Sequence, residues 1–292
     1  MAAGEVTEIV ALAAGTARVE VLPGMGGALA RVEVDGRPVL RPWSGDAGRG
    51  PFDVSSIVLA PFSNRISRPF SWGGETVTLE RNLPAEAFPI HGDAFQKRWS
   101  LAERTGDRVV LVLADGACGS LRYQAQLTYA VSAVGLTAGL ALTNRSGRAM
   151  PFGLGFHPWF PRDAGTRLEF QAESVWQEDA RHLPASDRPA VIPGHWDFAG
   201  ARPLPADWIN NAFDGWGGRA RIIQGDAGVS VVLRASASLG LLVVFSPGAQ
   251  ADFFCVEPVS HPVDAHNLPG MPGLAILKEG ETLSATMELD WA

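Results

Sequence analysis

Cysteine is rare in this chain, where only Cys118 and Cys255 occur among 292 residues. Two cysteines cannot form a disulfide framework or complete a cysteine-rich zinc site, so folds that depend on either are excluded. Both stand among small or apolar residues, where a free thiol is usually buried and chemically inert. We therefore expect neither cysteine to take part in the chemistry of the protein.

Long apolar runs and an excess of positive charge are missing as well. No stretch is long enough to span a bilayer, and the opening residues Met1 to Glu8 carry acids but no basic region of the kind that begins a secretory signal. The formal net charge of -7 argues against a nucleic-acid partner, because binding phosphates requires a basic face. These absences favour a cytoplasmic protein without membrane or nucleic-acid partners.

Signatures of nucleotide binding and of serine hydrolases are also absent. Neither a Walker loop nor a G-x-S-x-G nucleophile elbow occurs. The segment Pro23 to Leu29 is rich in glycine, but Leu29 replaces the third glycine of a dinucleotide-binding fingerprint, and strand-like alternation follows where that motif requires a helix. We interpret this segment as a turn and expect no cofactor.

The sequence does contain many segments in which apolar and polar residues alternate, the period of a half-buried strand. The clearest are 121–129 and 136–143, which we predict to form a hairpin through Ser132 to Gly135. Residues 283–291 alternate in the same way at the C-terminus. Further strands are predicted at 17–22, 29–34, 109–113, 229–233 and 239–245.

Helical periodicity is hard to find, and 33 glycines and 21 prolines punctuate the short strands. This pattern predicts an all-β protein built from two packed antiparallel sheets, with few or no long helices. No repeat or linker divides the chain, so we predict a single domain over residues 1–292. The longest segment without strand alternation, 179–207, contains His195, Trp196 and Phe198, and we expect an ordered loop over a sheet there rather than a flexible linker.

Histidines occur in two notable settings. His261 and His266 stand close together, but their spacing matches no recognised metal motif and Pro262 restricts the backbone, so we interpret them as part of a polar loop and expect no metal. His157 lies between aromatic residues, and Pro158 biases it toward an extended backbone, which favours a position at the end of a strand.

Arg65, His91 and Glu257 stand in similar short polar motifs. Each alone is better explained by an ordinary structural role, such as a surface ion pair, a turn residue or a solvated acid. Together with His157 they supply a guanidinium, two imidazoles and a carboxylate near aromatic rings, the groups that acid–base chemistry on a polyhydroxylated substrate requires. A sugar is therefore the expected ligand.

At these residues the sequence resembles the aldose 1-epimerase family, also called galactose mutarotases. The shared features span most of the chain, namely a Pro-x-x-Gly-Gly turn at 23–27, Asn64-Arg65, His91-Gly92, His157-Pro158, Trp-Ile-x-Asn-x-Phe at 208–213, and Val256-Glu257-Pro258 with Asn267 after it. The resemblance implies a large antiparallel β-sandwich, the galactose mutarotase-like supersandwich, with a sugar cleft on one sheet. It also implies interconversion of α and β anomers of a monosaccharide without cofactor or metal, by a monomer or homodimer.

The resemblance also assigns roles. It implies that Glu257 is the general base that removes the proton of the C1 hydroxyl, and that His157 is the general acid that protonates the ring oxygen. It places the remaining family residues, Asn64, Arg65, His91 and Asn210, at the substrate. Unperturbed pKa values of about 4.3 for glutamate and 6.5 for histidine would leave both catalytic groups close to the required states at neutral pH.

One position departs from the family pattern. Many members carry an aspartate that holds sugar hydroxyls where this chain has Asn210, and Asp207 or Asp214 could take its place if the loop is shifted. Three alternatives therefore stay open, a hexose-6-phosphate 1-epimerase, a sugar-binding or sugar-sensing protein without turnover, and a glycoside hydrolase. The last is the least favoured, because it usually needs two carboxylates and only Glu257 is nominated.

Overall fold

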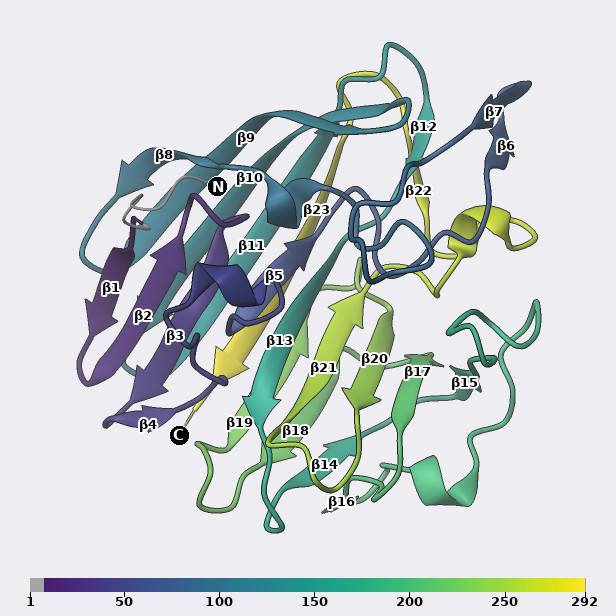
Figure 1. Ribbon diagram of the computed structural model, residues 1–292. Helices are drawn as coiled ribbons and strands as arrows, with labels where there is room; N and C mark the ends of the chain where they lie inside the picture. Colours follow the sequence, from purple (N-terminus) through teal and green to yellow (C-terminus); the bar gives the residue numbers. More distant parts are fainter. Residues whose placement is uncertain (1–7, 292) are drawn as a thin grey trace.

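The computed structural model describes residues 8–291 and consists almost entirely of antiparallel strands in two large sheets (Figure 1). Helix within these residues is limited to the short 3-10 turns η1 Ala47–Arg49, η2 Ala94–Gln96, η3 Gly194–Trp196 and η4 Ala265–Asn267. None of the helices in residues 8–291 has the length and apolar character needed to cross a bilayer. The predicted all-β sandwich without long helices is confirmed.

The first sheet, within residues 8–291, has ten strands in the order β1-β2-β3-β5-β13-β21-β20-β17-β15, with β4 paired to β3. Their bounds are β1 Val10–Ala14, β2 Ala17–Leu22, β3 Ala28–Val34, β4 Arg37–Pro38, β5 Ser56–Leu59, β13 Gly155–Pro161, β15 Ser174–Trp176, β17 Ile209–Asp214, β20 Leu241–Ser246 and β21 Phe253–Val259. Segments from both ends and the middle of the chain thus meet in β5, β13 and β21, at the centre of this sheet.

The second sheet has nine strands in the described part of the chain, in the order β16-β14-β18-β19-β23-β11-β10-β9-β8. Their bounds are β8 Ser100–Arg104, β9 Arg108–Cys118, β10 Leu121–Ser132, β11 Gly135–Asn144, β14 Arg167–Phe170, β16 Arg202–Pro203, β18 Arg219–Ile223, β19 Val231–Ala235 and β23 Thr282–Asp290. Two small ribbons pair β6 Phe70–Trp72 with β7 Glu75–Val77, and β12 Met150–Phe152 with β22 Ala275–Leu277.

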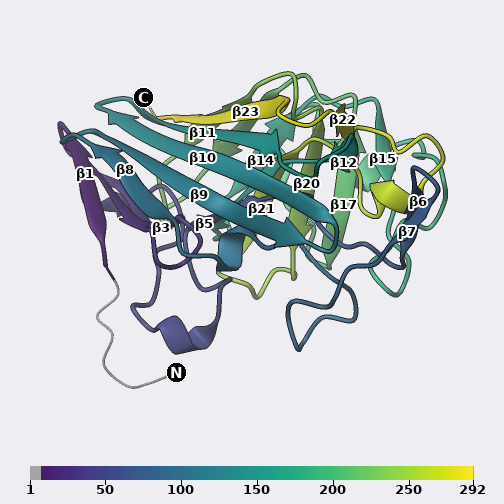
Figure 2. The ribbon, with the colours of Figure 1, turned by 90° about the horizontal axis from the view of Figure 1, so that it is seen from above.

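The hydrophobic core lies between the two large sheets, which form superposed layers in Figure 2. Along β10, buried Leu127 and Tyr129 alternate with exposed Gln124 and Gln126, so one face of the strand enters the core and the other meets solvent. The predicted hairpin is confirmed, since β10 and β11 pair from Tyr123 with Asn144 to Ser132 with Gly135. The strand predicted at 17–22 coincides with β2, and the C-terminal strand is present as β23.

The segment 179–207 is an ordered loop, as expected. It includes the turn η3 and the short strand β16. Phe198 is buried and packs on Phe170 and Phe213, with ring centroids 5.2 and 6.1 Å apart. In the glycine-rich segment 23–29, residues 23–27 form the expected turn and the last two residues begin β3.

The predicted position of His157 at a strand end is wrong. It lies inside β13, paired with Ile57 of β5. Pro158 is compatible with this strand because the residue before a proline favours the extended backbone that a strand requires. All seven residues of β13 are buried, since Phe156 and Phe160 enter the core while His157 and Trp159 point to the opposite face. That face carries the candidate site.

Candidate functional site

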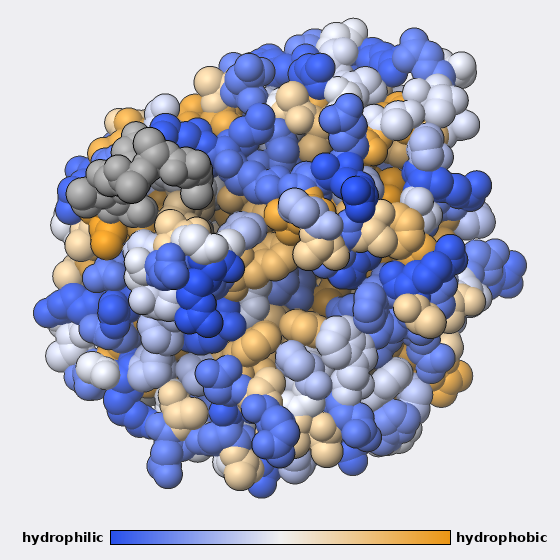
Figure 3. Space-filling view, in the orientation of Figure 1, coloured by the Kyte–Doolittle hydropathy of each residue, from blue (hydrophilic) through white to orange (hydrophobic). Residues whose placement is uncertain are grey.

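A cavity of about 430 Å³ opens on the face of the first sheet that points away from the core. The space-filling view shows it as a hollow near the middle of this face (Figure 3). All six residues predicted for the site line it, and they are joined by ten others that complete its wall. The full lining is Arg41, Arg49, Phe52, Asp53, Asn64, Arg65, Glu86, Ile90, His91, His157, Trp159, Trp208, Asn210, Phe245, Phe253 and Glu257.

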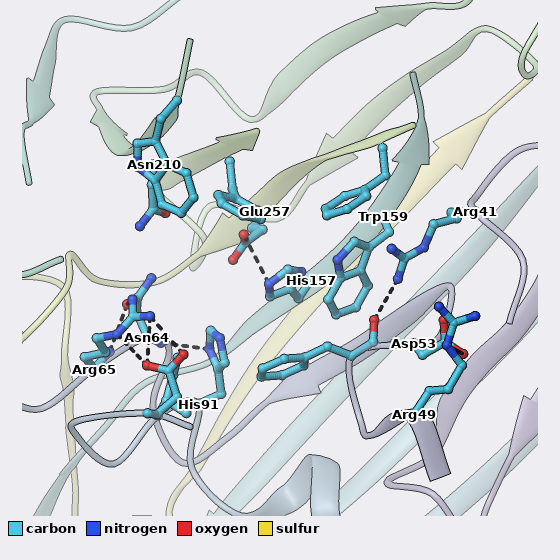
Figure 4. A pocket seen from close by; sticks show the side chains of 16 residues that line it. Arg41, Arg49, Asp53, Asn64, Arg65, His91, His157, Trp159, Asn210 and Glu257 are labelled. Atoms are coloured by element: carbon cyan, nitrogen blue, oxygen red, sulfur yellow. Dashed lines mark hydrogen bonds and ion pairs between the residues drawn. The ribbon is translucent and has the colours of Figure 1, made fainter. Parts of the chain in front are cut away.

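His157 and Glu257 face each other at the floor of this cavity. The pairing of Trp159 with Cys255 and of Gly155 with Val259 sets β13 and β21 in a register that places His157 opposite Glu257. The imidazole Nε2 lies 3.3 Å from the carboxyl Oε1 (Figure 4). The other atoms, His157 Nδ1 and Glu257 Oε2, are buried without hydrogen-bond partners, which leaves Nε2 and Oε1 as the atoms available to a ligand.

Burial shifts both ionisation equilibria in this pair. Loss of solvent raises the pKa of Glu257 to about 8 and lowers the pKa of His157 to about 3. The expectation of nearly unperturbed groups is therefore wrong. Both residues are buried, with 2% of Glu257 and 7% of His157 exposed. Because burial disfavours the charged form of each, the pair together carries one proton throughout the neutral pH range.

Aromatic rings form the cavity wall beside the imidazole and account for part of its desolvation. The Trp159 indole stacks on His157 with ring centroids 4.0 Å apart and an interplanar angle of 19°. Phe52 lies beyond at 6.3 Å from the same imidazole, also nearly parallel. Trp159 belongs to the aromatic run noticed in the sequence, whereas Phe52 comes from the loop before β5 and carries no comparable local signal. These rings could cover the apolar face of a sugar.

Asn64 and His91 are joined by two hydrogen bonds on one side of the pair, one to the His91 imidazole and one between the two backbones. The Asn64 N–H donates to His91 Nδ1 at 3.0 Å, and the His91 N–H donates to the Asn64 carbonyl at 2.9 Å. Since Nδ1 accepts, the neutral imidazole must carry its proton on Nε2. Burial lowers the pKa of His91 well below its usual range, so this residue is a neutral hydrogen-bond donor to the cavity.

Gly92 allows this arrangement. Its φ is +71°, and a Cβ there would lie 2.0 Å from the carbonyl oxygen of Ala60, so any other residue would push the His91 turn away from the sheet.

Arg65 is held against the cavity wall by Glu86. Its Nε and Nη2 donate to the two carboxylate oxygens at 3.0 and 3.1 Å, a bidentate pair that fixes the plane of the guanidinium. Its Nη1 also donates to Asn64 Oδ1 at 3.3 Å. Glu86 was not foreseen, because only the folded chain brings its loop next to Arg65. Asn64, His91, Arg65 and Glu86 form the polar wall of the cavity. Figure 4 shows the first three on one side of the His157–Glu257 pair and Trp159 on the other.

Asn210 lines the cavity from β17, and its amide Nδ2 donates to Glu178 Oε2 at 2.8 Å. Trp208, at the cavity edge, donates its indole N–H to the same carboxylate. Neither Asp207 nor Asp214 is part of the cavity lining, so the idea that one of them replaces a family aspartate is wrong. The carboxylate next to position 210 is Glu178.

Arg41 closes the end of the cavity beyond Trp159. Its guanidinium donates to the Phe52 carbonyl at 2.7 Å and lies over the ring of Phe253, 4.6 Å from the centroid. Within residues 8–291 no carboxylate lies within ion-pair distance of it, whereas the neighbouring Arg49 lies 4.0 Å from Asp53. Sequence reasoning missed Arg41, since nothing in its local sequence distinguishes it from other arginines.

Two histidine groups bear on metal binding. His157, Cys255 and Glu257 have donor atoms within 4.8 Å of one another and could surround an ion, but metal binding needs a thiolate. Burial and the nearby Glu257 raise the pKa of the Cys255 thiol well above its usual range. His261 accepts the Ser63 N–H at 3.0 Å through Nε2, and its Nδ1 lies 2.8 Å from the Pro262 carbonyl, as expected of a polar loop.

Known proteins resemble the chain over nearly all of its length. The sequence model of the family described as Aldose 1-epimerase matches residues 8–290. The uncharacterised protein YphB of Escherichia coli K12 is 33% identical over 288 residues, which cover 96% of this chain and 98% of that protein.

Solved structures of other proteins resemble this fold over nearly the whole chain. That of a candidate aldose 1-epimerase from Escherichia coli K12 has a TM-score of 0.91 at 31% identity, covering 98% of this chain and 99% of that one. A galactose mutarotase-like protein from Clostridium acetobutylicum shares the fold, with a TM-score of 0.86 at 22% identity and coverage of 98% and 95%.

Proposed function

The chain belongs to the aldose 1-epimerase family, and on this premise we propose that it interconverts the α and β anomers of a hexose or related aldose, without cofactor or metal. The observation that carries the proposal is the buried pair of His157 Nε2 and Glu257 Oε1, 3.3 Å apart at the floor of a cavity. Anomer exchange needs one proton to leave O1 while another reaches O5, and these two oxygens share the anomeric carbon. A single base and a single acid side by side match that requirement.

The reaction proceeds by ring opening. Ionised Glu257 removes the proton from the C1 hydroxyl, the C1–O5 bond breaks to give an aldehyde, and protonated His157 delivers its proton to O5. Rotation about C1–C2 presents the other face of the aldehyde, and ring closure reverses both transfers. The pair starts and finishes with one proton in total, the count that the two pKa shifts give at neutral pH. Because burial favours the neutral form with this proton on Glu257, the proton passes from Glu257 Oε1 to His157 Nε2 across 3.3 Å before the ring opens.

The polar wall supports the substrate in this proposal. The His91 Nε2–H and the Arg65 guanidinium donate to sugar oxygens, and both donors are oriented before the ligand arrives, by Asn64 and Glu86 respectively. Preorganised donors near a developing negative charge contribute to lowering the barrier, beyond the roughly 10²–10⁴-fold that each positioned acid or base supplies.

Polarimetry tests the proposal. Freshly dissolved α-D-glucose and α-D-galactose should mutarotate faster with the purified protein than without it. Absence of acceleration across a panel of aldoses, with protein shown to be folded by circular dichroism, would overturn the proposal. Sugar affinity in calorimetry without any acceleration would favour the sugar-binding alternative instead.

Arg41 favours a second candidate, the epimerisation of a hexose 6-phosphate. The half-buried Arg41 guanidinium, which has no carboxylate partner among residues 8–291, lies at the end of the cavity and could pair with a phosphate on C6. Rate measurements on glucose and glucose 6-phosphate under the same conditions separate the two candidates. If the phosphorylated sugar is preferred, Arg41→Gln should remove that preference and leave the rate on glucose nearly unchanged.

A further inference from the structure

Glu178 organises the cavity wall from outside the cavity. Its carboxylate accepts hydrogen bonds from Asn210 Nδ2, at 2.8 Å, and from the Trp208 indole N–H. It also lies 2.8 Å from His182 Nδ1. Asn210 and Trp208 line the cavity, whereas Glu178 does not. The Glu178 N–H donates to Asn211 Oδ1 at 3.1 Å, which anchors this carboxylate to β17. One acid thus sets the orientation of two groups that a ligand would meet.

The chemistry of a carboxylate fixes which way the Asn210 amide points. An ionised carboxylate only accepts hydrogen bonds, so the NH₂ of Asn210 must face Glu178 and the oxygen Oδ1 must face the other way. No protein donor among residues 8–291 is bonded to Oδ1, and the residue lines the cavity. A charge-assisted bond on the NH₂ side also polarises the amide and makes its oxygen a better acceptor.

We propose that Glu178 is a positioning residue that makes Asn210 a pure hydrogen-bond acceptor for one hydroxyl of the aldose. This inference rests on the proposed function for the identity of the ligand. The asparagine then offers a sugar hydroxyl the same acceptor that an aspartate would offer, without placing a charge in the cavity. The hydroxyl that meets it must be free, because an ether, an ester or a fluorine at that carbon has no proton to donate.

A purely structural role for Glu178 fits the surrounding loop less well. The tip of that loop is held by Asp179, which accepts the Arg181 N–H at 2.7 Å and the Leu183 N–H at 3.1 Å through Oδ1. Its base is joined by a bridge between Glu178 and Pro184 that uses only backbone atoms. The loop therefore has stabilising contacts besides the one between Glu178 and His182, and the same carboxylate also accepts from Trp208 and Asn210.

Exchanging the amide and the carboxylate tests the inference. Asn210→Asp puts two carboxylates within about 3 Å, so we expect kcat/KM to fall at least about tenfold at pH 7. Glu178→Gln leaves one acceptor oxygen for two donors, and KM should rise about five- to tenfold while kcat changes little. In the double variant the new amide at position 178 donates to the new carboxylate at position 210 and accepts from Trp208, so kcat/KM should return to within about threefold of the wild type.

The recovery in the double variant is the decisive result. Glu103→Gln, in an exposed ion pair with Arg108 far from the cavity, serves as the control for loss of a carboxylate and should leave all parameters unchanged. A double variant no more active than Asn210→Asp, or a Glu178→Gln variant with wild-type KM, would overturn the positioning role. Melting temperatures of all four variants show whether any loss reflects unfolding.

Calorimetric titration with D-glucose and D-galactose keeps this test separate from the proposed function. If the wild type binds a sugar but accelerates no mutarotation, the proposed function fails, and the same pattern of loss and recovery in Kd still supports the role of Glu178. If the protein turns over aldoses but the double variant shows no recovery, the positioning role fails and the function stands. A wild type that neither binds nor turns over any aldose overturns both.

Discussion

The imidazole of His157 and the carboxyl of Glu257 stand opposite each other on adjacent antiparallel strands, with Nε2 and Oε1 3.3 Å apart. Both are buried, and the pKa shifts have opposite signs, so that one proton is shared by the pair at neutral pH. The strand ladder, and not a flexible loop, sets the distance between the proposed acid and base. This rigidity makes the consequences of changing either residue specific.

Replacement of Glu257 by glutamine should remove most activity without loss of stability. Glutamine cannot take a proton from O1, so we expect kcat to fall by about 10²-fold or more. The neutral amide resembles the protonated acid that burial favours, so the melting temperature should stay the same or rise. Polarimetry and thermal denaturation measure the two effects. A variant with near wild-type kcat would contradict the role of Glu257.

The pH dependence of kcat/KM should report the shared proton. Burial puts the pair in its one-proton state between about pH 3 and about pH 8, so the rate should be flat through neutrality and fall about tenfold per unit at higher pH as the last proton is lost. If ionised Glu257 sufficed without a protonated partner, the rate would instead rise toward pH 8. The spontaneous rate must be subtracted at each pH.

Acid should destabilise the fold through its buried imidazoles. Burial lowers the pKa of His91, His157, His261 and His266, so as pH falls below about 6.5 the unfolded chain binds protons that the folded chain does not. Each contributes a loss of up to about 1.4 kcal/mol per pH unit in the free energy of unfolding. Glu257 has the opposite effect, because its pKa is raised from 4.5 to about 8 and the folded chain binds its proton more readily than the unfolded chain in this range. Its contribution to the free energy of unfolding offsets that of about one imidazole.

Urea denaturation at pH 6.5, 5.5 and 5.0 measures this slope. His266→Leu removes one buried imidazole and should make the slope shallower by about 1.4 kcal/mol per unit, whatever its effect on absolute stability. His195→Gln is the matched control for loss of a histidine, because the His195 side chain is exposed. Equal slopes in the wild type and His266→Leu would contradict the prediction.

Glu86→Gln should weaken substrate binding more than turnover. The bidentate pair that holds the Arg65 guanidinium loses its charge and one of its two acceptors, so the donor toward the sugar is less well oriented. We expect KM to rise about three- to tenfold with kcat reduced less than about threefold. Initial rates over a range of sugar concentrations measure both. An unchanged KM would show that Arg65 needs no such support.

The strands that alternate in sequence were predictable, and the two that carry His157 and Glu257, β13 and β21, were not. β10 and β11 each have one face in the core and one face toward solvent, so apolar and polar residues alternate along their sequences. β13 and nearly all of β21 are buried on both faces, where the core and the cavity wall each demand apolar or enclosed side chains, and the alternation disappears. His157 therefore looked like a residue at a strand end.

The six site residues named from the family pattern were found together, but the groups that orient them were not named. Glu86 and Glu178 act through hydrogen bonds to residues 21 and 32 positions away. No local sequence motif predicts such a contact, because the contact depends on how the loops pack together after the strands have paired. The pKa directions were unpredictable for the same reason, since burial is a property of the assembled sheet.

The order β5-β13-β21 at the centre of the first sheet has a kinetic consequence. The loop after β5 is joined to the segment after β21 by a hydrogen bond from Ser63 to His261 across 198 residues, and by another from Ser67 to Asp264 across 197. Contacts of such long sequence separation form slowly, because the chain must first close large loops. Catalytic competence should therefore return late in refolding, after most strands have formed.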